Sequence, residues 1–159
     1  MLLADTQTLV SWRARPRSFV ALMGLYESNY IRLGWLAGDL RALSGRHVSS
    51  VHGDCDLVLT VTGRSPYTST LTLTYLLAEA RALETSPDLR IRVYHDAHLV
   101  EAQQWAGTPP PPLLRRLGGC PERELGQRWA RNMMLNKWLE YCVERGHRFP
   151  TRTEYSAGA

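Results

Sequence analysis

The sequence predicts an α+β domain: an N-terminal helix, a three- to four-stranded antiparallel sheet, and a C-terminal helix packed on one sheet face. Near both ends of the 159-residue chain, apolar residues recur at spacings of three and four, which is the helical period. Between these regions the pattern changes to alternation, the period of a strand with one buried face. A segment of hairpin length and turn-forming composition separates two alternating runs. The length suits one domain with one core.

The first helix is expected to begin after Ser18, a good N-cap residue, and to continue to about Leu43. Its interior glycines weaken it, so a bend or break is expected near Gly38. The positions that recur at helical spacing are Phe19, Leu22, Met23, Tyr26, Tyr30, Leu33 and Leu36 or Ala37. The aromatic residues among them are interpreted as core, because large apolar side chains at this spacing usually pack inward.

The alternating runs 57–62 and 70–75 predict two strands of an antiparallel hairpin, joined by the loop 63–67. An earlier strand is predicted around residues 46–52. A later strand begins near Leu89 and is expected to run on towards Trp105. The sheet is therefore expected to have three or four strands.

The Pro/Gly-rich stretch 107–121 cannot be a helix or a central strand, because four consecutive prolines remove four backbone donors. It is predicted to be a stiff connector within a single domain of residues 19–149. Pro121 then opens the final helix, whose core stripe ends before Gly146. Residues 1–18 are predicted to be a basic, flexible tail, and residues 150–159 a frayed end.

Three scattered cysteines without a C-x-x-C pair argue against a disulfide framework or a zinc knuckle. The sequence has no apolar run long enough to span a bilayer, and its first residues do not resemble a signal peptide. A cytoplasmic protein without a membrane partner is expected. No cofactor is predicted.

The basic residues are eighteen arginines and one lysine, a bias typical of a GC-rich genome. They concentrate in the tail and around the start of the final helix, so nucleic-acid binding through these two regions is one hypothesis. It is the weaker one, because nucleic-acid-binding surfaces usually gather a denser basic stripe with interleaved aromatic residues.

The most distinctive segment is Arg92-Val-Tyr94-His95-Asp96-Ala97 with Glu101 four residues later. It resembles the R-L-Y-H-D-A-x-x-x-E segment of the YqiB-like bacterial proteins. Three further blocks, at residues 23–33, 64–68 and 136–146, resemble that family in the same order. The resemblance implies a domain of unknown function and provides no reaction, ligand or catalytic residue.

One face of the predicted sheet carries hydroxyl and guanidinium groups, from Thr60, Thr62, Thr70, Thr72, Thr74, Arg90, Arg92 and Tyr94. The ordinary alternative is a solvated face, because antiparallel sheets commonly expose one side. Our first hypothesis is a small non-enzymatic binding or interaction domain, whose arginines pair with a protein partner or a small anionic ligand. The candidate surface consists of Arg64, Tyr67, Arg90, Arg92, Tyr94, His95, Asp96 and Glu101.

The second hypothesis is a cryptic hydrolase centred on His95, Asp96, His98 and Glu101. Three of these residues, His95, Asp96 and His98, are weak candidates for metal ligands. Their spacing argues against a shared metal, because neighbouring residues of a strand point to opposite faces.

Overall fold

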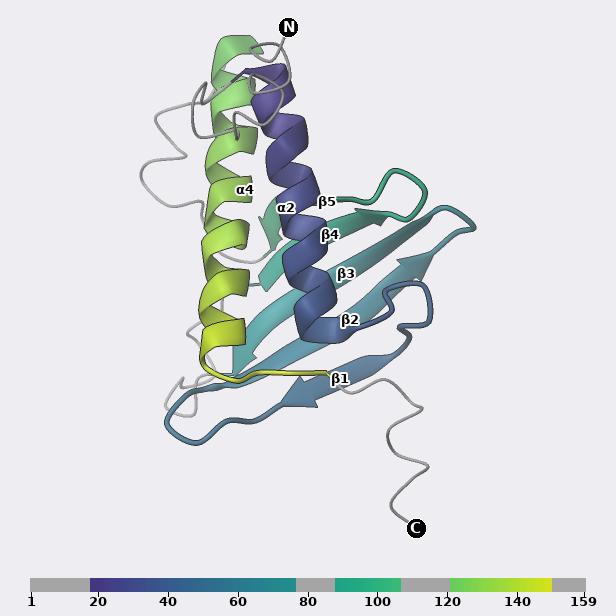
Figure 1. Cartoon of the computed structure of the whole chain (residues 1–159), viewed down its shortest axis with the longest axis vertical. Coiled ribbons are helices and arrows are strands. Elements are labelled where there is room, and N and C mark those ends of the chain that lie inside the picture. The colour runs from purple at the N-terminus through teal and green to yellow at the C-terminus, as the bar shows by residue number, and fades with distance from the viewer. Residues whose placement is uncertain (1–17, 77–87, 107–120, 150–159) are drawn as a thin grey trace, which may run out of the picture.

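The computed structural model describes residues 18–76, 88–106 and 121–149. The predicted tail at 1–17, the connector at 107–120 and the frayed end at 150–159 lie outside the described residues. The structure is an α+β arrangement, as predicted. Two helices, α2 (Phe19–Ala37) and α4 (Pro121–Glu144), lie side by side on one face of an antiparallel sheet, with their N-terminal ends together (Figure 1).

The sheet has five strands in the order β1-β2-β3-β4-β5, so every strand pairs with its neighbour in the sequence. All four pairings are antiparallel. The strands are β1 (Arg46–Ser49), β2 (Asp56–Arg64), β3 (Thr68–Leu76), β4 (Asp88–Tyr94) and β5 (Leu99–Ala106). The predicted hairpin is present as β2 and β3, and the earlier strand is present as β1.

The prediction of three or four strands was wrong, because the later strand does not run on to Trp105. The chain reverses after Tyr94 and returns as β5, which pairs antiparallel with β4. The turn contains no glycine or proline. His98 instead adopts a left-handed conformation with φ 54°, which a sequence pattern does not reveal for a histidine.

Helix α2 begins where predicted, since the Ser18 side chain accepts a hydrogen bond of 3.1 Å from the amide of Ala21. It ends at Ala37, six residues before the predicted end, because Gly38 takes φ 70° and stops the helix. The following turn still buries Leu40 and Leu43. The expected break near Gly38 is therefore confirmed.

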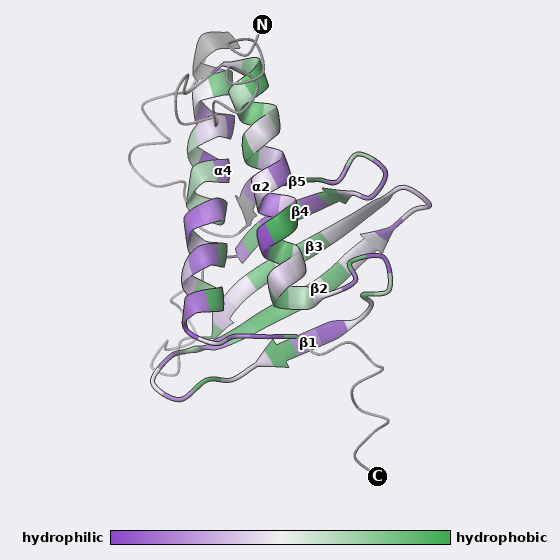
Figure 2. Cartoon of the chain, in the orientation of Figure 1, coloured by the Kyte–Doolittle hydropathy of each residue, from purple (hydrophilic) through white to green (hydrophobic). Residues whose placement is uncertain are grey.

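The core lies between the helices and the inner face of the sheet. Apolar and polar residues alternate along the strands (Figure 2), so one face of each strand packs under the helices. The core includes Leu33, Leu36, Leu57, Leu59, Leu71, Leu73, Leu89, Ile91, Val93, Val100, Leu135, Leu139 and Cys142. Within the described part of the chain, neither helix has the length and apolar character needed to cross a membrane.

Candidate functional site

The N-terminal halves of α2 and α4 extend past the edge of the sheet beside β5 (Figure 1). A groove of about 470 Å³ opens at this place. Its volume is within the range of small-ligand sites. Both helices and the β4–β5 end contribute to it, through Phe19, Leu22, Met23, Tyr26, Tyr94, Ala97, Leu99, Glu101, Glu124, Leu125 and Arg128.

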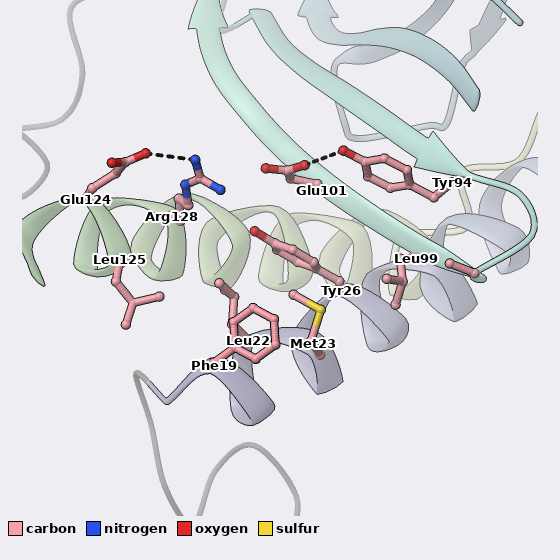
Figure 3. A pocket seen from close by; sticks show the side chains of 11 residues that line it. Phe19, Leu22, Met23, Tyr26, Tyr94, Leu99, Glu101, Glu124, Leu125 and Arg128 are labelled. Atoms are coloured by element: carbon pink, nitrogen blue, oxygen red, sulfur yellow. Dashed lines mark hydrogen bonds and ion pairs between the residues drawn. The ribbon is translucent and has the colours of Figure 1, made fainter. Parts of the chain in front are cut away.

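One wall of the groove is apolar. Phe19, Leu22 and Met23 come from the first turns of α2, and Leu125 faces them from α4 (Figure 3). Phe19 is 68% exposed among the described residues, although phenylalanine usually occupies a core. This wall can take an apolar group.

The other wall is polar, and its groups come from three elements. Arg128 donates to Glu124 over 2.8 Å, and the Tyr94 hydroxyl donates to Glu101 over 2.9 Å. The Tyr26 hydroxyl lies between these two pairs (Figure 3). Tyr26 is only 5% exposed, and its hydroxyl forms no hydrogen bond of ordinary geometry with a described residue, although the Arg128 guanidinium lies close enough to act on it. A buried hydroxyl without a partner is uncommon in folded proteins, so it indicates a place for a ligand or water.

The surroundings keep the Tyr26 hydroxyl protonated at neutral pH. Burial and the negative charge of Glu101 raise the pKa of Tyr26 to about 12, while Arg128 and Arg131 oppose this rise. Burial and the hydrogen bond to Glu101 likewise raise the pKa of Tyr94. Both phenols are therefore hydrogen-bond donors under physiological conditions.

The polar sheet face continues from this groove. Strand register places Thr60, Thr72 and Arg90 in one row across β2, β3 and β4. In a second row, Thr70 pairs with Arg92, and Arg92 pairs with Glu101, which lines the groove. The helices lie on the opposite face (Figure 1), and no described element covers this one. Of the two sequence-predicted arginines, Arg90 is exposed and Arg92 is half-buried.

Two further candidates, Arg64 and Tyr67, lie at the β2–β3 turn. Both are exposed, and Tyr67 has 64% of its surface accessible. The backbone carbonyl of Tyr67 accepts a 2.8 Å hydrogen bond from the amide of His95. The hairpin turn and the end of β4 are thus joined, and the predicted surface extends from the groove along the sheet to this turn.

The structure places His95 inside the protein rather than on this surface. Its ring is 3% exposed on the helix side of the sheet, with Nε2 2.8 Å from the Ser69 hydroxyl, and Nδ1 has no hydrogen-bond partner among the residues that the structure describes. Burial, together with the charges of Arg41 and Arg64, lowers the pKa of His95. His95 is therefore a neutral, packed side chain.

The other residues of the proposed hydrolase centre point in separate directions. Asp96 is exposed and pairs with Arg41 at 2.9 Å. The His98 ring stacks on Tyr30 with 5.0 Å between centroids. Glu101 faces the groove. Among the described residues, no group of three or more His, Cys, Asp or Glu side chains gathers as a metal site would require.

The basic start of α4 is described only in part, since the side chains of residues 107–123 lie outside the described residues. Arg128 is paired with Glu124. Arg131 is partly buried beside Tyr26, and burial lowers its pKa. Arg128 lines the groove, and Arg131 lies behind it, whereas the sequence pattern suggested that both belong to a nucleic-acid surface.

Sequence reasoning missed a second polar cluster, formed by Ser49, Asp54 and His147. The His147 ring is buried, with Nδ1 3.1 Å from the Ser49 hydroxyl and Nε2 3.0 Å from the Asp54 carboxylate. Ser49 also accepts from the Arg148 amide at 3.0 Å. The cluster has the residue types of a hydrolytic triad, but its serine is buried and satisfied, so it joins the C-terminal segment to β1.

Cys142 does not supply a nucleophile to this region. It is fully buried, as its helical spacing predicted, and its sulfur lies 3.3 Å from the Tyr75 hydroxyl. Burial raises the pKa of the Cys142 thiol to about 11. The reactive thiolate is therefore scarce at neutral pH.

These features define a class of small α+β domain, in which two helices cover one face of a five-stranded antiparallel sheet and a groove opens at the sheet edge. Within this class, residues 32–148 match the family described as Protein of unknown function (DUF1249), and the chain belongs to that family. Comparisons with curated proteins and with solved structures gave no match. The β4, β5 and α4 parts of the groove lie inside the matched residues, while Phe19, Leu22, Met23 and Tyr26 precede them.

Proposed function

We propose that this protein is a small non-enzymatic binding domain that holds an amphipathic small molecule in the groove between α2, α4 and β5. The observation that carries the proposal is the Tyr26 hydroxyl, which is buried, has no partner among the described residues and faces a groove of about 470 Å³. Pockets for small ligands are mostly apolar, with a few polar groups that orient the ligand. The groove has this composition.

The chemistry of the lining favours binding over catalysis. The polar residues that line the groove are two tyrosines, two glutamates and an arginine. The two tyrosines have raised pKa values, and the arginine is paired with one of the glutamates. These groups suit hydrogen bonding at neutral pH. The hydrolase centred on His95, Asp96, His98 and Glu101 stays a prediction with less support, because its side chains are dispersed.

The polar sheet face supports a second role in the same protein, contact with a protein partner. Arg90 is exposed on this face beside a row of threonines. Guanidinium groups pair readily with carboxylates, so an acidic partner surface suits it. Tyr94 and Glu101 lie on this face and also line the groove, so a partner bound here would contact the ligand site.

We further propose that the chain is of the YqiB-like bacterial type and acts in the cytoplasm. Its resemblance to the Y-H-D-A segment supports the first statement. The buried Cys142 thiol and the scattered cysteines support a reducing compartment.

The groove can be tested with n-octyl glucoside, an uncharged amphiphile, used below its micelle concentration in an amide-resolved NMR titration of the full chain. We expect saturable shift changes in the first turns of α2, in α4 around Leu125 and in β5 around Leu99. Leu125→Glu should abolish them, because a charge on the apolar wall opposes burial of the octyl chain.

Val48→Glu is the matched control, because Val48 is exposed on β1, far from the groove in the strand order. It should leave the titration unchanged. Met23→Glu repeats the test on the α2 side, and circular dichroism verifies that each variant is folded. Shifts that do not saturate, or that respond equally to Leu125→Glu and Val48→Glu, would contradict the proposal.

A further inference from the structure

The polar wall of the groove alternates in charge. Along this wall, Glu124 pairs with Arg128, the Tyr26 hydroxyl follows, and Glu101 with Tyr94 completes the series (Figure 3). We propose that the groove binds a ligand whose polar end carries both a carboxylate and an ammonium group, that is, an α-amino acid with a long apolar side chain. This inference rests on the proposed function and specifies its ligand.

Glu101 provides the site for the ammonium group. Within the described part of the chain, its one hydrogen bond is accepted from the neutral Tyr94 hydroxyl, and it forms no ion pair there. A carboxylate beside apolar side chains is stabilised by a cation that donates hydrogen bonds to it. The carboxylate therefore has both the charge and the free acceptor positions that an ammonium group requires.

Arg128 and Tyr26 provide the site for the carboxylate group. Arg128 donates through Nη2 to Glu124, and its guanidinium also acts on the Tyr26 hydroxyl, so the two groups face the same part of the groove. The pair of Arg128 and Glu124 is solvent-exposed, with 45% and 62% of the two side chains accessible, so a ligand can compete for the guanidinium. The buried Tyr26 hydroxyl donates a further hydrogen bond. Arginine and tyrosine together give directional recognition of a carboxylate.

The balance of charges argues against a ligand with only one of the two groups. Arg131 also acts electrostatically on Tyr26 and Glu101, and its buried Nε has no hydrogen-bond partner in the described parts of the chain. Arg128 and Arg131 together offset the charges of Glu101 and Glu124. Arg92 lies opposite Glu101 in the strand register and acts on Tyr94, but it forms no ion pair with Glu101. A simple carboxylate would leave Glu101 without an ion pair, and a simple amine would be repelled by the guanidinium groups. A zwitterion satisfies both ends of the wall.

The test compares three ligands with eight-carbon chains: octanoate, octylamine and 2-aminooctanoate. Each is titrated into the full chain by isothermal calorimetry at pH 7 and low ionic strength. We expect 2-aminooctanoate to bind about tenfold more tightly than either single-charge ligand, since one charge-assisted contact distinguishes it from each. Glu101→Gln should reduce its affinity to about that of octanoate, and Arg128→Gln to about that of octylamine.

Two further variants check the assignment. Tyr26→Phe should weaken 2-aminooctanoate and octanoate by about threefold or more and leave octylamine unchanged, because only a carboxylate uses the hydroxyl. Arg90→Gln, on the exposed sheet face, should leave all three affinities unchanged. Glu101 and Arg128 are surface-accessible, so these variants keep the test informative if Tyr26→Phe affects folding.

The outcomes separate the two proposals. The zwitterion assignment is wrong if the three ligands bind with equal affinity. It is also wrong if Glu101→Gln and Arg128→Gln leave the affinity for 2-aminooctanoate unchanged. Binding of octyl glucoside would then still support the groove as a ligand site. If neither octyl glucoside nor any charged ligand binds, both proposals are wrong.

Discussion

At the scale of single residues, three buried asparagines connect both helices to the outer edge of β5. The Asn132 carbonyl accepts from the Ala102 amide at 2.7 Å and from Asn29 at 3.2 Å. Asn29 also donates to the Val100 carbonyl, and Asn136 donates to Asn29. Among the described strands, β5 pairs with β4 alone, so these side chains form hydrogen bonds with backbone groups on the free edge of β5.

We expect Asn132→Ala to lower the free energy of unfolding by about 2 kcal/mol, because the Ala102 amide would be buried without an acceptor. Urea unfolding at pH 7 measures this change. Gln104→Ala is the control, since Gln104 is exposed on the same strand and should change stability by less than about 0.5 kcal/mol. Similar losses of stability in both variants would show that the hydrogen bond between the Ala102 amide and Asn132 does not stabilise the fold.

The candidate site was predictable from the sequence only in part. Tyr94 was singled out at the end of an alternating strand and Glu101 in the polar segment that follows it, and both line the groove. Tyr26 was assigned to the core from its helical spacing, and its ring is buried. Helical spacing shows which face of the helix a residue occupies. It does not show which groups surround the terminal atoms of a long side chain. The groove-facing hydroxyl could therefore not be foreseen.

At the scale of elements, Gly34 within α2 and Gly38 at its C-terminal cap have two different physical roles. Gly34 lies inside the helix, and an added Cβ there would meet no atom within 4 Å. Gly38 stops the helix with φ 70°, a conformation that other residues rarely adopt. The same residue type is thus dispensable at one position and required four residues later.

Gly34→Ala should stabilise the protein by about 0.5–1 kcal/mol, because alanine loses less backbone entropy in a helix. Gly38→Ala should destabilise it by about 2 kcal/mol through backbone strain. Thermal unfolding followed by circular dichroism compares the pair directly. A stabilising effect of Gly38→Ala would show that the helix does not depend on this glycine for its end.

The β4–β5 reversal shows where element-level prediction stops. The strand from Leu89 onward was recognised from its alternation, but the alternation does not mark the turn. The turn depends on the left-handed His98, whose ring stacks on Tyr30 of α2. This contact joins residues 68 positions apart, so no local pattern contains it.

At the scale of the whole molecule, the segment that follows α4 returns to the sheet and forms hydrogen bonds with residues far away in the sequence. His147 contacts Asp54 and Ser49, and the Phe149 amide donates to the Leu36 carbonyl over 2.8 Å. Hydrogen bonds from His147 and the Cys55 amide lower the pKa of the Asp54 carboxyl below its ordinary value of 3.8, although burial opposes this. The segment therefore links α2, β1 and the β1–β2 loop.

A lowered carboxyl pKa means that the folded state binds fewer protons than the unfolded state in acid. The contribution of Asp54 is fully present above its ordinary pKa, and it is lost as the pH falls through the lower pKa of the folded protein. Asp54→Asn should therefore reduce the loss of stability between pH 4 and pH 2. At pH 7 it should cost about 1–3 kcal/mol, since His147 loses a charged partner.

Urea unfolding measured from pH 2 to pH 7 tests this expectation. Asp96→Asn is the matched control, because its ion pair with Arg41 is well exposed and contributes little. The control should keep the acid dependence of the original protein. If Asp54→Asn and the original protein lost stability in parallel below pH 4, Asp54 would not be the group responsible.

The sequence by itself determined the α+β class, the start of α2, its break near Gly38 and the β2–β3 hairpin. These features follow from local periodicity and from the conformational preferences of neighbouring residues. Only the tertiary structure decided which polar groups meet. Tyr26, Glu101 and Arg128 come from three elements that are far apart in the chain, and helix packing beyond the edge of β5 brings them together. Such a site is a property of packing geometry, which local sequence patterns do not encode.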